Sequence, residues 1–327
     1  MDSIFNKTIE VPGQPENGYG TGWLPSMPDT RDYDESHIEV TKILGKLNIP
    51  KKLSAPPAQM DLRQWCSPVE NQGRLGSCTA NAAVGIVEYF ENRGFSKYIE
   101  GSRLFVYKTT RNLMGVVGDT GAFIRTTMQS LTLCGVPDEK FWPYTDRTQP
   151  GVSQDRYFDD EPTAFVYALA DNYEAVKYFR HDTIGKSPAQ ILENVKKWIV
   201  MYIPSMFGFY VFPSYTQSDV PGAFPYPSQE ERAIGGHAVV AVGYDDGKKI
   251  KNLRNGKVTT GALLIRNSWG ISWGDKGYGW LPYDYILNGL ASDFWSLTAL
   301  KWIETDQFGF PGSLAEAAEH GITANKH

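Results

Sequence analysis

The sequence predicts an α+β fold, in which a helical half is followed by a β half and a cleft lies between the two layers. Two patterns predict this order. In the first two thirds of the chain, apolar side chains recur at intervals of three and four, whereas short runs rich in β-branched and aromatic residues follow from about residue 207. With 327 residues, 41% of them hydrophobic, the chain can bury a large core in one or two domains.

Charge and composition favour a soluble protein. The net charge is −5 and no long basic run is present, so we expect neither nucleic acid nor an anionic membrane as a partner. The first residues lack a basic segment followed by an apolar one, and no stretch approaches the roughly 20 apolar residues of a membrane span. We therefore expect no signal peptide and no membrane anchor.

Three cysteines, Cys66, Cys78 and Cys134, form an odd and sparse set. Small secreted proteins with disulfide frameworks use even and dense sets, so this pattern indicates a reducing compartment. Cys66 and Cys134 are expected to serve in packing, because free cysteines are usually buried. A disulfide between these two remains open.

The chain divides into three predicted parts. Residues 1–57 are rich in Pro and Gly and largely lack periodicity, so we expect an extended arm that lies across a surface groove. The main domain is expected over residues 58–303, with its helical half at about 58–185 and its β half at about 186–303. A peripheral tail is expected over residues 304–327.

Three helices are predicted in chain order. The first spans residues 78–92, and Gly94 follows as a stop signal. The second spans residues 121–133. The third begins after Ser187, a capping residue that is followed by proline at the first helical position, and it ends near residue 200.

Three strands are predicted after these helices. They cover residues 207–211, 238–244 and 262–266, which are short β-rich runs bounded by turn-forming residues. The change from helices to strands along the chain is the basis for the α+β prediction.

Cys78 stands at the predicted start of the first helix. Unpaired N–H groups and the positive end of the helix dipole favour a thiolate there, and the thiolate is the nucleophilic form. Gln72 lies six positions earlier, after which Gly73 and Gly76 allow a tight loop. Its side-chain N–H and the backbone N–H of Cys78 would stabilise an oxyanion. The alternative is a buried structural cysteine.

Two later residues complete a set for nucleophilic catalysis. His237 begins an apolar strand after two glycines, and Asn267 follows another apolar strand. An imidazole can take the proton of a thiol and return it to a leaving amine, while a neutral amide fixes the position and tautomer of the ring. The alternatives are a core histidine and a turn asparagine. Together with Cys78, these residues indicate a cysteine hydrolase that needs no metal or cofactor.

These segments resemble the papain-like cysteine peptidases, the papain and cathepsin clan. The resemblance runs from about residue 61 to residue 302 and rests on six blocks in one order, which is more specific than any single block. The blocks are Asp61-Leu62-Arg63, residues 72–78, Gly121-Ala122-Phe123, Trp142-Pro143-Tyr144, Gly236-His237-Ala238, and Asn267-Ser268-Trp269-Gly270 with Trp273-Gly274.

The resemblance implies a papain-like fold, with a helical left subdomain, an antiparallel β-sheet or barrel in the right subdomain, and the active-site cleft between them. It also implies roles for four residues. Cys78 would be the nucleophile, His237 the acid and base, Asn267 the orienter of the imidazole, and Gln72 the oxyanion donor.

The resemblance further implies a substrate-binding site for peptides. Gly121 and Ala122 would pair with the substrate backbone. Phe123, Ile124 and Ala238 would line the pocket for the second residue before the cut. Trp269 would cover the hydrogen bond between the imidazole and the amide.

Several positions depart from the family pattern. Leu75 stands where many members have a disulfide cysteine, and Thr79 stands where a Trp usually follows the nucleophile. The first change fits a disulfide-free intracellular enzyme. His237 lies 159 residues after Cys78, beyond the ~130–150 usual in the family, so loops have been inserted. The segment 245–260 is expected to be one of them.

The N-terminal arm also departs from the cathepsin type, because it has no long charged helix. It looks like the short arm of compact bacterial and viral members, which favours a cytoplasmic or virion-associated location over secretion. We expect the part that contains Trp23 and Tyr33 to fold back over the cleft. The arm would then act as an intramolecular inhibitor of a zymogen.

The sequence thus predicts a thiol peptidase that cuts peptide bonds in proteins or peptides through a thioester acyl-enzyme. Two alternatives remain open. A transglutaminase or amidase would use the same Cys and His but typically an Asp orienter, where this chain has Asn267. An inactive binding protein of the same fold is the other, and Thr79 leaves it open.

Overall fold

A computed structural model describes residues 5, 7–12, 18–38, 40–41, 56–147, 157–171 and 175–300. The predicted C-terminal tail and the part of the arm just before residue 56 lie outside the described residues. The description therefore covers the segments expected to carry the site.

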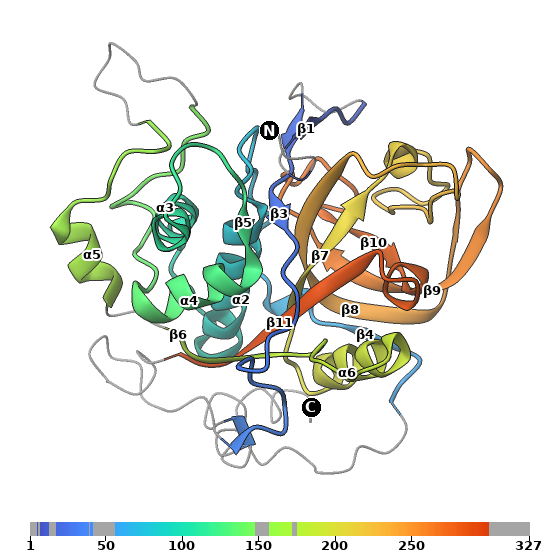
Figure 1. Ribbon diagram of the computed structural model, residues 1–327, viewed down its shortest axis with the longest axis horizontal. Helices are drawn as coiled ribbons and strands as arrows, with labels where there is room; N and C mark the ends of the chain where they lie inside the picture. The colour runs from blue at the N-terminus through green and yellow to red at the C-terminus, as the bar shows by residue number, and fades with distance from the viewer. Residues whose placement is uncertain are drawn as a thin grey trace.

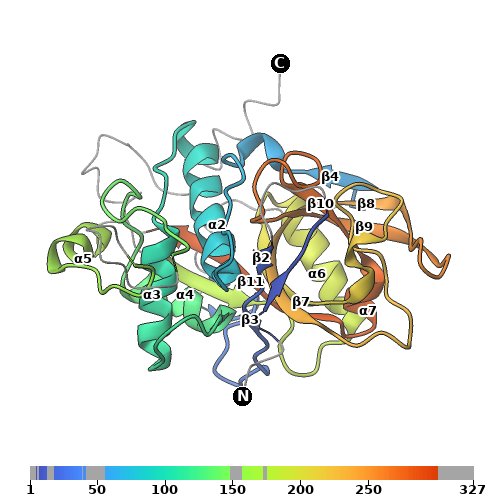
Figure 2. The same cartoon turned by 90° about the horizontal axis from the view of Figure 1, so that it is seen from above.

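The described chain forms two layers with the arm between them. Helices α2 to α5 lie on one side, and a large antiparallel sheet with α6 against it lies on the other (Figure 1). From above, β3 of the arm lies between α2 and β7 (Figure 2). The predicted α+β class is confirmed.

The elements have the following bounds. The helices are α2 (Cys78–Phe95), α3 (Arg103–Met114), α4 (Ile124–Leu133), α5 (Ala164–Ala170), α6 (Pro188–Val200) and α7 (Tyr283–Leu287), with 3-10 turns at Arg63–Trp65 and Pro213–Thr216. The strands are β1 (Thr8–Ile9), β2 (Tyr19–Gly20), β3 (Trp23–Leu24), β4 (Gln59–Asp61), β5 (Ala122–Phe123), β6 (Ala175–Arg180), β7 (Ser205–Val211), β8 (Gly235–Lys251), β9 (Val258–Arg266), β10 (Tyr278–Pro282) and β11 (Ala291–Leu300).

The main sheet has seven strands in the order β10-β9-β8-β7-β11-β6, and β4 pairs with β8 outside this path. All of these pairings are antiparallel. β4 and β6 come from the part of the chain before residue 185, so the sheet ties both predicted halves together. Strand β8 pairs with three strands and carries His237 near its start.

The predicted elements are present with changed bounds. The second predicted helix begins at Ile124 rather than residue 121, because Ala122–Phe123 forms a strand that pairs with the arm. The segment 245–260, expected as an inserted loop, mostly extends β8 and β9 into a longer hairpin in which Lys249 pairs with Thr260. Its lysines therefore lie on a projecting ribbon.

Local sequence signals predicted some helices correctly and missed others. The helix expected after Ser187 is α6, and its capping box joins Ser187 and Gln190 as expected of an N-cap. Helix α3 was not predicted from the sequence. Its buried stretch includes the charged side chains of Arg103, Lys108 and Arg111, whose burial a pattern of apolar residues does not reveal.

Helix α2 is the core element on which the two layers meet. Every residue from Cys78 to Glu91 is buried. At Gly85, an added Cβ would lie 2.0 Å from Nη1 of Arg266, the last residue of β9. The Arg266 guanidinium cannot easily move away, because Nη2 donates to Ser67 and to the carbonyl of Pro68.

Two further findings concern the cysteines and the helices. Cys66, Cys78 and Cys134 form no disulfide, so the open question of a bond between Cys66 and Cys134 is answered for this structure. Among the described residues, no helix combines the length and the apolar character that crossing a membrane requires.

We predict that Gly85→Ala destabilises the protein by about 1–3 kcal/mol, as overpacking of a core does. A change from Gly to Ala inside a helix usually stabilises a protein instead, since Ala is favoured over Gly there by about 1 kcal/mol. Urea unfolding followed by circular dichroism measures the change. Gly247→Ala is the matched control, because its nearest neighbour would lie 3.4 Å away. A Gly85→Ala variant as stable as the parent chain would contradict the packing argument.

Candidate active site

Cys78 is the first residue of α2 and is fully buried. The preceding residue, Ser77, does not cap the helix with its side chain. Its hydroxyl lies 2.6 Å from the Tyr144 hydroxyl instead. The N–H groups of the first turn therefore remain available to the sulfur, as the position of the thiol at the helix start suggested.

Two other elements bring backbone N–H groups to the sulfur. These belong to Ala238 on β8 and Gly22 in the arm, and with the N–H of Thr79 they lower the pKa of the Cys78 thiol. Burial is the larger effect and raises that pKa to about 12. In the arm-covered structure the sulfur is consequently a neutral thiol at pH 7.

His237 and Asn267 meet across neighbouring strands. Nε2 of His237 lies 2.7 Å from Oδ1 of Asn267, and because a carboxamide oxygen only accepts, Nε2 is the protonated nitrogen. Nδ1 is then an acceptor, and it is buried without a hydrogen-bond partner among the described residues. Burial lowers the pKa of His237 to about 4, against the hydrogen bond to Asn267, which raises it.

Trp269 lies against the His237 ring, with ring centroids 4.8 Å apart. Tyr19 of the arm stacks on the same indole, with ring centroids 5.3 Å apart. Trp269 is fully buried in this arrangement. The indole therefore shields the bond between His237 and Asn267 from water, while the arm covers the indole.

The Gln72 amide is held at both ends. Its Oε1 accepts from the Ser268 hydroxyl at 2.5 Å, and its Nε2 donates to the carbonyls of Leu75 at 2.7 Å and Gly20 at 2.9 Å. Gly20 belongs to the arm. Both hydrogens of the Gln72 amide are thus in use, one of them on the arm.

The arm runs through the site as an extended chain. Gly22 donates its N–H to the carbonyl of Gly236 at 2.9 Å and accepts from the N–H of Ala122 at 2.7 Å. The next residues form β3, which pairs in parallel with β5. A Cβ on Gly121, whose φ is +71°, would lie 2.4 Å from the Gly22 carbonyl oxygen, so only glycine fits there.

Trp23 anchors the arm beside the sulfur. Its ring lies on Gly208 of β7, where any Cβ would clash with the indole, and its Nε1 donates to the Asp293 carboxylate at 3.2 Å. Asp293 also accepts from Ser26 at 2.8 Å and from the Trp295 indole at 2.8 Å. A large aromatic side chain with an N–H donor thus fills this pocket.

The arm contacts several of the predicted site residues: Gly20 accepts from Gln72, Gly22 accepts from Ala122, and Tyr19 stacks on Trp269. Ala122, Ile124 and Ala238 are buried, whereas Phe123 is half-buried. Sequence reasoning missed Ser268 and Asp293. Ser268 adjoined a recognised residue, but Asp293 carried no signal because its contacts with the arm come from residues distant in the chain.

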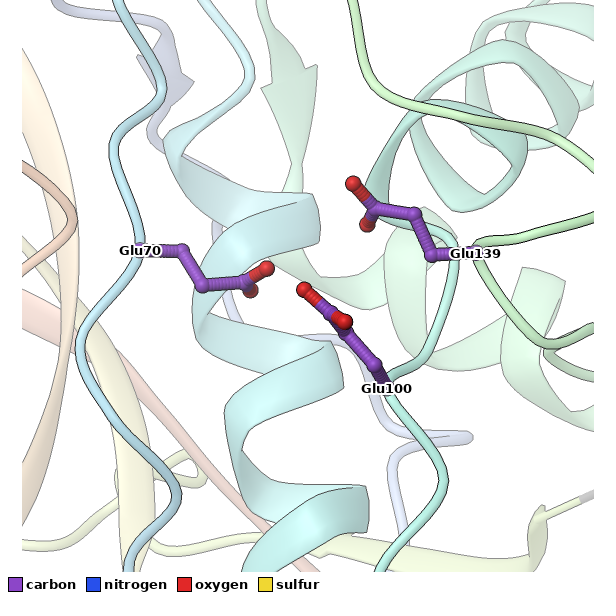
Figure 3. A group of neighbouring side chains, drawn as sticks. All are labelled: Glu70, Glu100 and Glu139. Carbon is purple, nitrogen blue, oxygen red and sulfur yellow. The ribbon is translucent and has the colours of Figure 1, made fainter.

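A second group of acidic side chains lies behind the site. Carboxylate oxygens of Glu70, Glu100 and Glu139 lie within 4.8 Å of one another beside α2 (Figure 3). Arg103 contacts Glu70 at 3.0 Å and Glu139 at 2.9 Å. Burial raises the pKa of Glu70 to about 8, against Arg103, which lowers it. The Arg103 guanidinium already pairs with two of these carboxylates, so we assign no metal site to the cluster.

The comparison with known families decides the identity. The profile of the papain family cysteine proteases matches residues 56–292. The chain belongs to this family. It is a papain-family cysteine peptidase, which removes the transglutaminase and amidase alternative.

Relatives of this papain-family peptidase include viral, bacterial and animal proteins. It is 33% identical over 290 residues to an uncharacterized peptidase C1-like protein of Acanthamoeba polyphaga mimivirus, covering 84% of this chain and 85% of that protein. It is 29% identical over 238 residues to cathepsin K of Gallus gallus, covering 72% of this chain and 61% of that protein.

The crystal structure of xylellain, a cysteine protease from Xylella fastidiosa, superposes on this peptidase with a TM-score of 0.66. The two share 32% sequence identity over 84% of this chain and 94% of xylellain. The papain-like fold expected from the sequence is therefore shown by a solved relative as well.

We predict that iodoacetamide alkylates Cys78 of the full-length peptidase slowly at pH 7. A thiol with a pKa near 12 rather than the ordinary 8.5 has on the order of a thousandfold less thiolate. The rate should rise with pH through the alkaline range. The measurement uses a Cys66→Ala, Cys134→Ala background, with mass spectrometry as readout. Fast alkylation that is independent of pH between 5 and 8 would contradict a neutral buried thiol.

Proposed function

We propose that this peptidase hydrolyses peptide bonds through a thioester formed on Cys78, with His237 as acid and base. One observation carries the proposal. The imidazole donates from Nε2 to Asn267 and leaves Nδ1 as an acceptor, and the next residue, Ala238, directs its N–H to the sulfur. A base that can accept a proton therefore stands at the strand end that adjoins the thiol.

The reaction follows in two halves. The Cys78 sulfur attacks the carbonyl carbon of the substrate while its proton passes to Nδ1 of His237. The tetrahedral intermediate then collapses, the C–N bond breaks, and His237 gives the proton to the leaving amine. In the second half, water loses a proton to His237 and attacks the thioester, the C–S bond breaks, and the proton returns to the sulfur.

Asn267 and Gln72 would assist different steps. Asn267 fixes the tautomer that leaves Nδ1 as acceptor, without placing a negative charge beside the thiolate. Gln72 would donate Nε2–H to the oxyanion, together with the backbone N–H of Cys78. Ser268 supports this role, since its hydroxyl orients the Gln72 amide with the NH2 group toward the cleft side.

The substrate backbone would pair with Gly121 and Ala122, where the arm now lies. Phe123, Ile124 and Ala238 would border the pocket for the second residue before the cut, and Trp269 would border the residues after it. The contacts that the arm makes support this assignment, because β3 pairs with β5 and Tyr19 stacks on Trp269. We assign residues 58–303 to this peptidase domain.

We predict that Gln72→Ala lowers kcat by about 10²–10³ with little change in KM, as expected for the loss of one oxyanion donor. A fluorogenic dipeptide substrate gives both constants. Gln217→Ala is the matched control, because within the described part of the chain that exposed amide donates to Thr216 alone. Equal kcat values for the parent chain and Gln72→Ala would contradict the assignment.

We further propose that the arm before residue 58 keeps the enzyme latent. Three contacts support this. The Gly20 carbonyl uses the Gln72 hydrogen that an oxyanion would need, Gly22 covers the sulfur, and Trp23 fills the adjoining pocket. The arm thus contacts the proposed oxyanion donor, the nucleophile and the pocket beside them.

The direction of the arm also favours latency. Tyr19 lies at Trp269 and Trp23 lies at Ala122, so the arm passes the sulfur from the leaving-group side to the acyl side. A substrate would run the other way, with its acyl side at Ala122. Because the arm runs in the reverse direction, its peptide bonds face Cys78 in the wrong orientation for attack. The arm can therefore occupy the site without being cut.

A second contact holds the arm farther along the chain. Asp32 pairs with Arg125 at 2.6 Å and lies 3.4 Å from Arg180. Tyr33, which we expected over the cleft together with Trp23, lies away from the sulfur, where it is partly exposed and stacks on His37. The covering residues are therefore Tyr19 to Trp23, and Asp32 is the outer latch.

We predict that Gly22→Ala or Trp23→Ala in the full-length chain raises activity on a fluorogenic dipeptide at least tenfold. The added Cβ of Gly22→Ala would lie 2.0 Å from the Gly76 carbonyl oxygen and displace the arm, whereas Trp23→Ala removes its anchor. Met27→Ala is the matched control, since that side chain is 84% exposed on the same arm. Unchanged activity in both variants, with the fold intact, would contradict latency.

A further inference from the structure

One peptide unit next to the sulfur is bonded on both of its faces. The carbonyl of Leu75 accepts from Nε2 of Gln72 at 2.7 Å. The N–H of the same peptide unit, carried by Gly76, donates to the two carboxylate oxygens of Asp119 at 3.0 and 3.2 Å. Because a peptide unit is planar and rigid, the bond to Asp119 also fixes the carbonyl that holds Gln72.

Asp119 is itself held in place. The Tyr107 hydroxyl donates to its Oδ1 at 2.5 Å, and the same hydroxyl accepts from the N–H of Gly121 at 3.1 Å. Tyr107 is fully buried on α3. The carboxylate therefore joins three segments: the loop before the sulfur, helix α3, and the backbone that leads into β5.

The loop needs such a connection. Gly76 lacks a Cβ, so its peptide unit can turn over at little steric cost, and a turned unit would present N–H to the Gln72 amide in place of the carbonyl. Residues 72–77 contain no cysteine, and the three cysteines of the chain form no disulfide. No covalent link therefore holds this loop among the described residues. Hydrogen bonds from N–H to a carboxylate are about twice as strong as neutral ones.

We propose that Asp119 is a positioning residue for catalysis, which orients the oxyanion donor Gln72 through the Leu75–Gly76 peptide unit. It does so by charge-assisted hydrogen bonds, in a loop that no disulfide secures among the described residues. The inference rests on the proposed role of Gln72 as oxyanion donor. Asp119 also reaches the backbone of Gly121 through the Tyr107 hydroxyl, so the test must separate the path to Gln72 from the path to the substrate backbone site.

The test compares kcat, KM and Cys78 alkylation in Asp119→Ala and Asp119→Asn. Both are made in the full-length chain, with and without Trp23→Ala. We expect Asp119→Ala to lower kcat about 10- to 100-fold, less than the loss of the donor itself, with KM within about twofold. Asp119→Asn keeps one acceptor oxygen, so its kcat should lie between the values for Asp119→Ala and the parent chain. Iodoacetamide alkylation forms no oxyanion, so its rate should change less than about twofold.

A double-mutant cycle isolates the path through Gln72. In a Gln72→Ala background, Asp119→Ala should lower kcat less than about threefold further, because its target is gone. Asp159→Asn is the structural control. That carboxylate accepts from Gly118 and pairs with Arg111 in the same region but does not contact Gly76, so it should lower thermal stability with kcat nearly unchanged.

Each result decides between the two proposals. If Gln72→Ala leaves kcat unchanged, the proposed oxyanion role fails. If Gln72→Ala lowers kcat but Asp119→Ala and Asp119→Asn do not, only the positioning role of Asp119 is overturned. The positioning role is also overturned if Asp119→Ala lowers kcat by the same factor in the Gln72→Ala background as in the parent chain. It is likewise overturned if the rate of Cys78 alkylation falls together with kcat. Either outcome would mean general damage to the fold.

Discussion

Complete burial of α2 is the constraint on which the rest of this structure depends. A helix enclosed from Cys78 to Glu91 must have a close neighbour on every face, and small residues such as Ala83 and Gly85 permit that approach. The strand ends that carry His237 and Asn267 are then held at the start of the helix by packing. The position of the sulfur is thus a consequence of the core rather than of a flexible loop.

The same burial governs the electrostatics of the site. Removing water penalises charge, so it raises the pKa of the Cys78 thiol and lowers the pKa of the His237 imidazole. Both groups are neutral in the arm-covered structure, whereas nucleophilic attack requires a thiolate. Moving the arm would admit water and reduce both shifts together. In the proposed latent form, the arm would oppose catalysis in two ways: it would fill the substrate site and it would desolvate the pair.

Polar contacts across the chain replace covalent links in this peptidase. The loop before Cys78 is tied by Asp119, and the Gln72 amide by Ser268. The arm is tied by Asp293 and Asp32. Each of the three carboxylates is oriented by further donors, which matters because a buried polar group is stabilising only when its partners are in place. Such a design requires no oxidising environment.

The sequence by itself determined the residue types of the site, their order, and the elements whose signals are local. Helix α2 begins at the predicted residue and α6 has the predicted cap, because both depend on neighbours a few positions away. Only the tertiary structure decided the path of the arm, the role of Asp293 and the strength of the pKa shifts. The indole of Trp23 and the carboxylate of Asp293 are 270 positions apart, and no local pattern can reveal a contact that exists only after the core has formed.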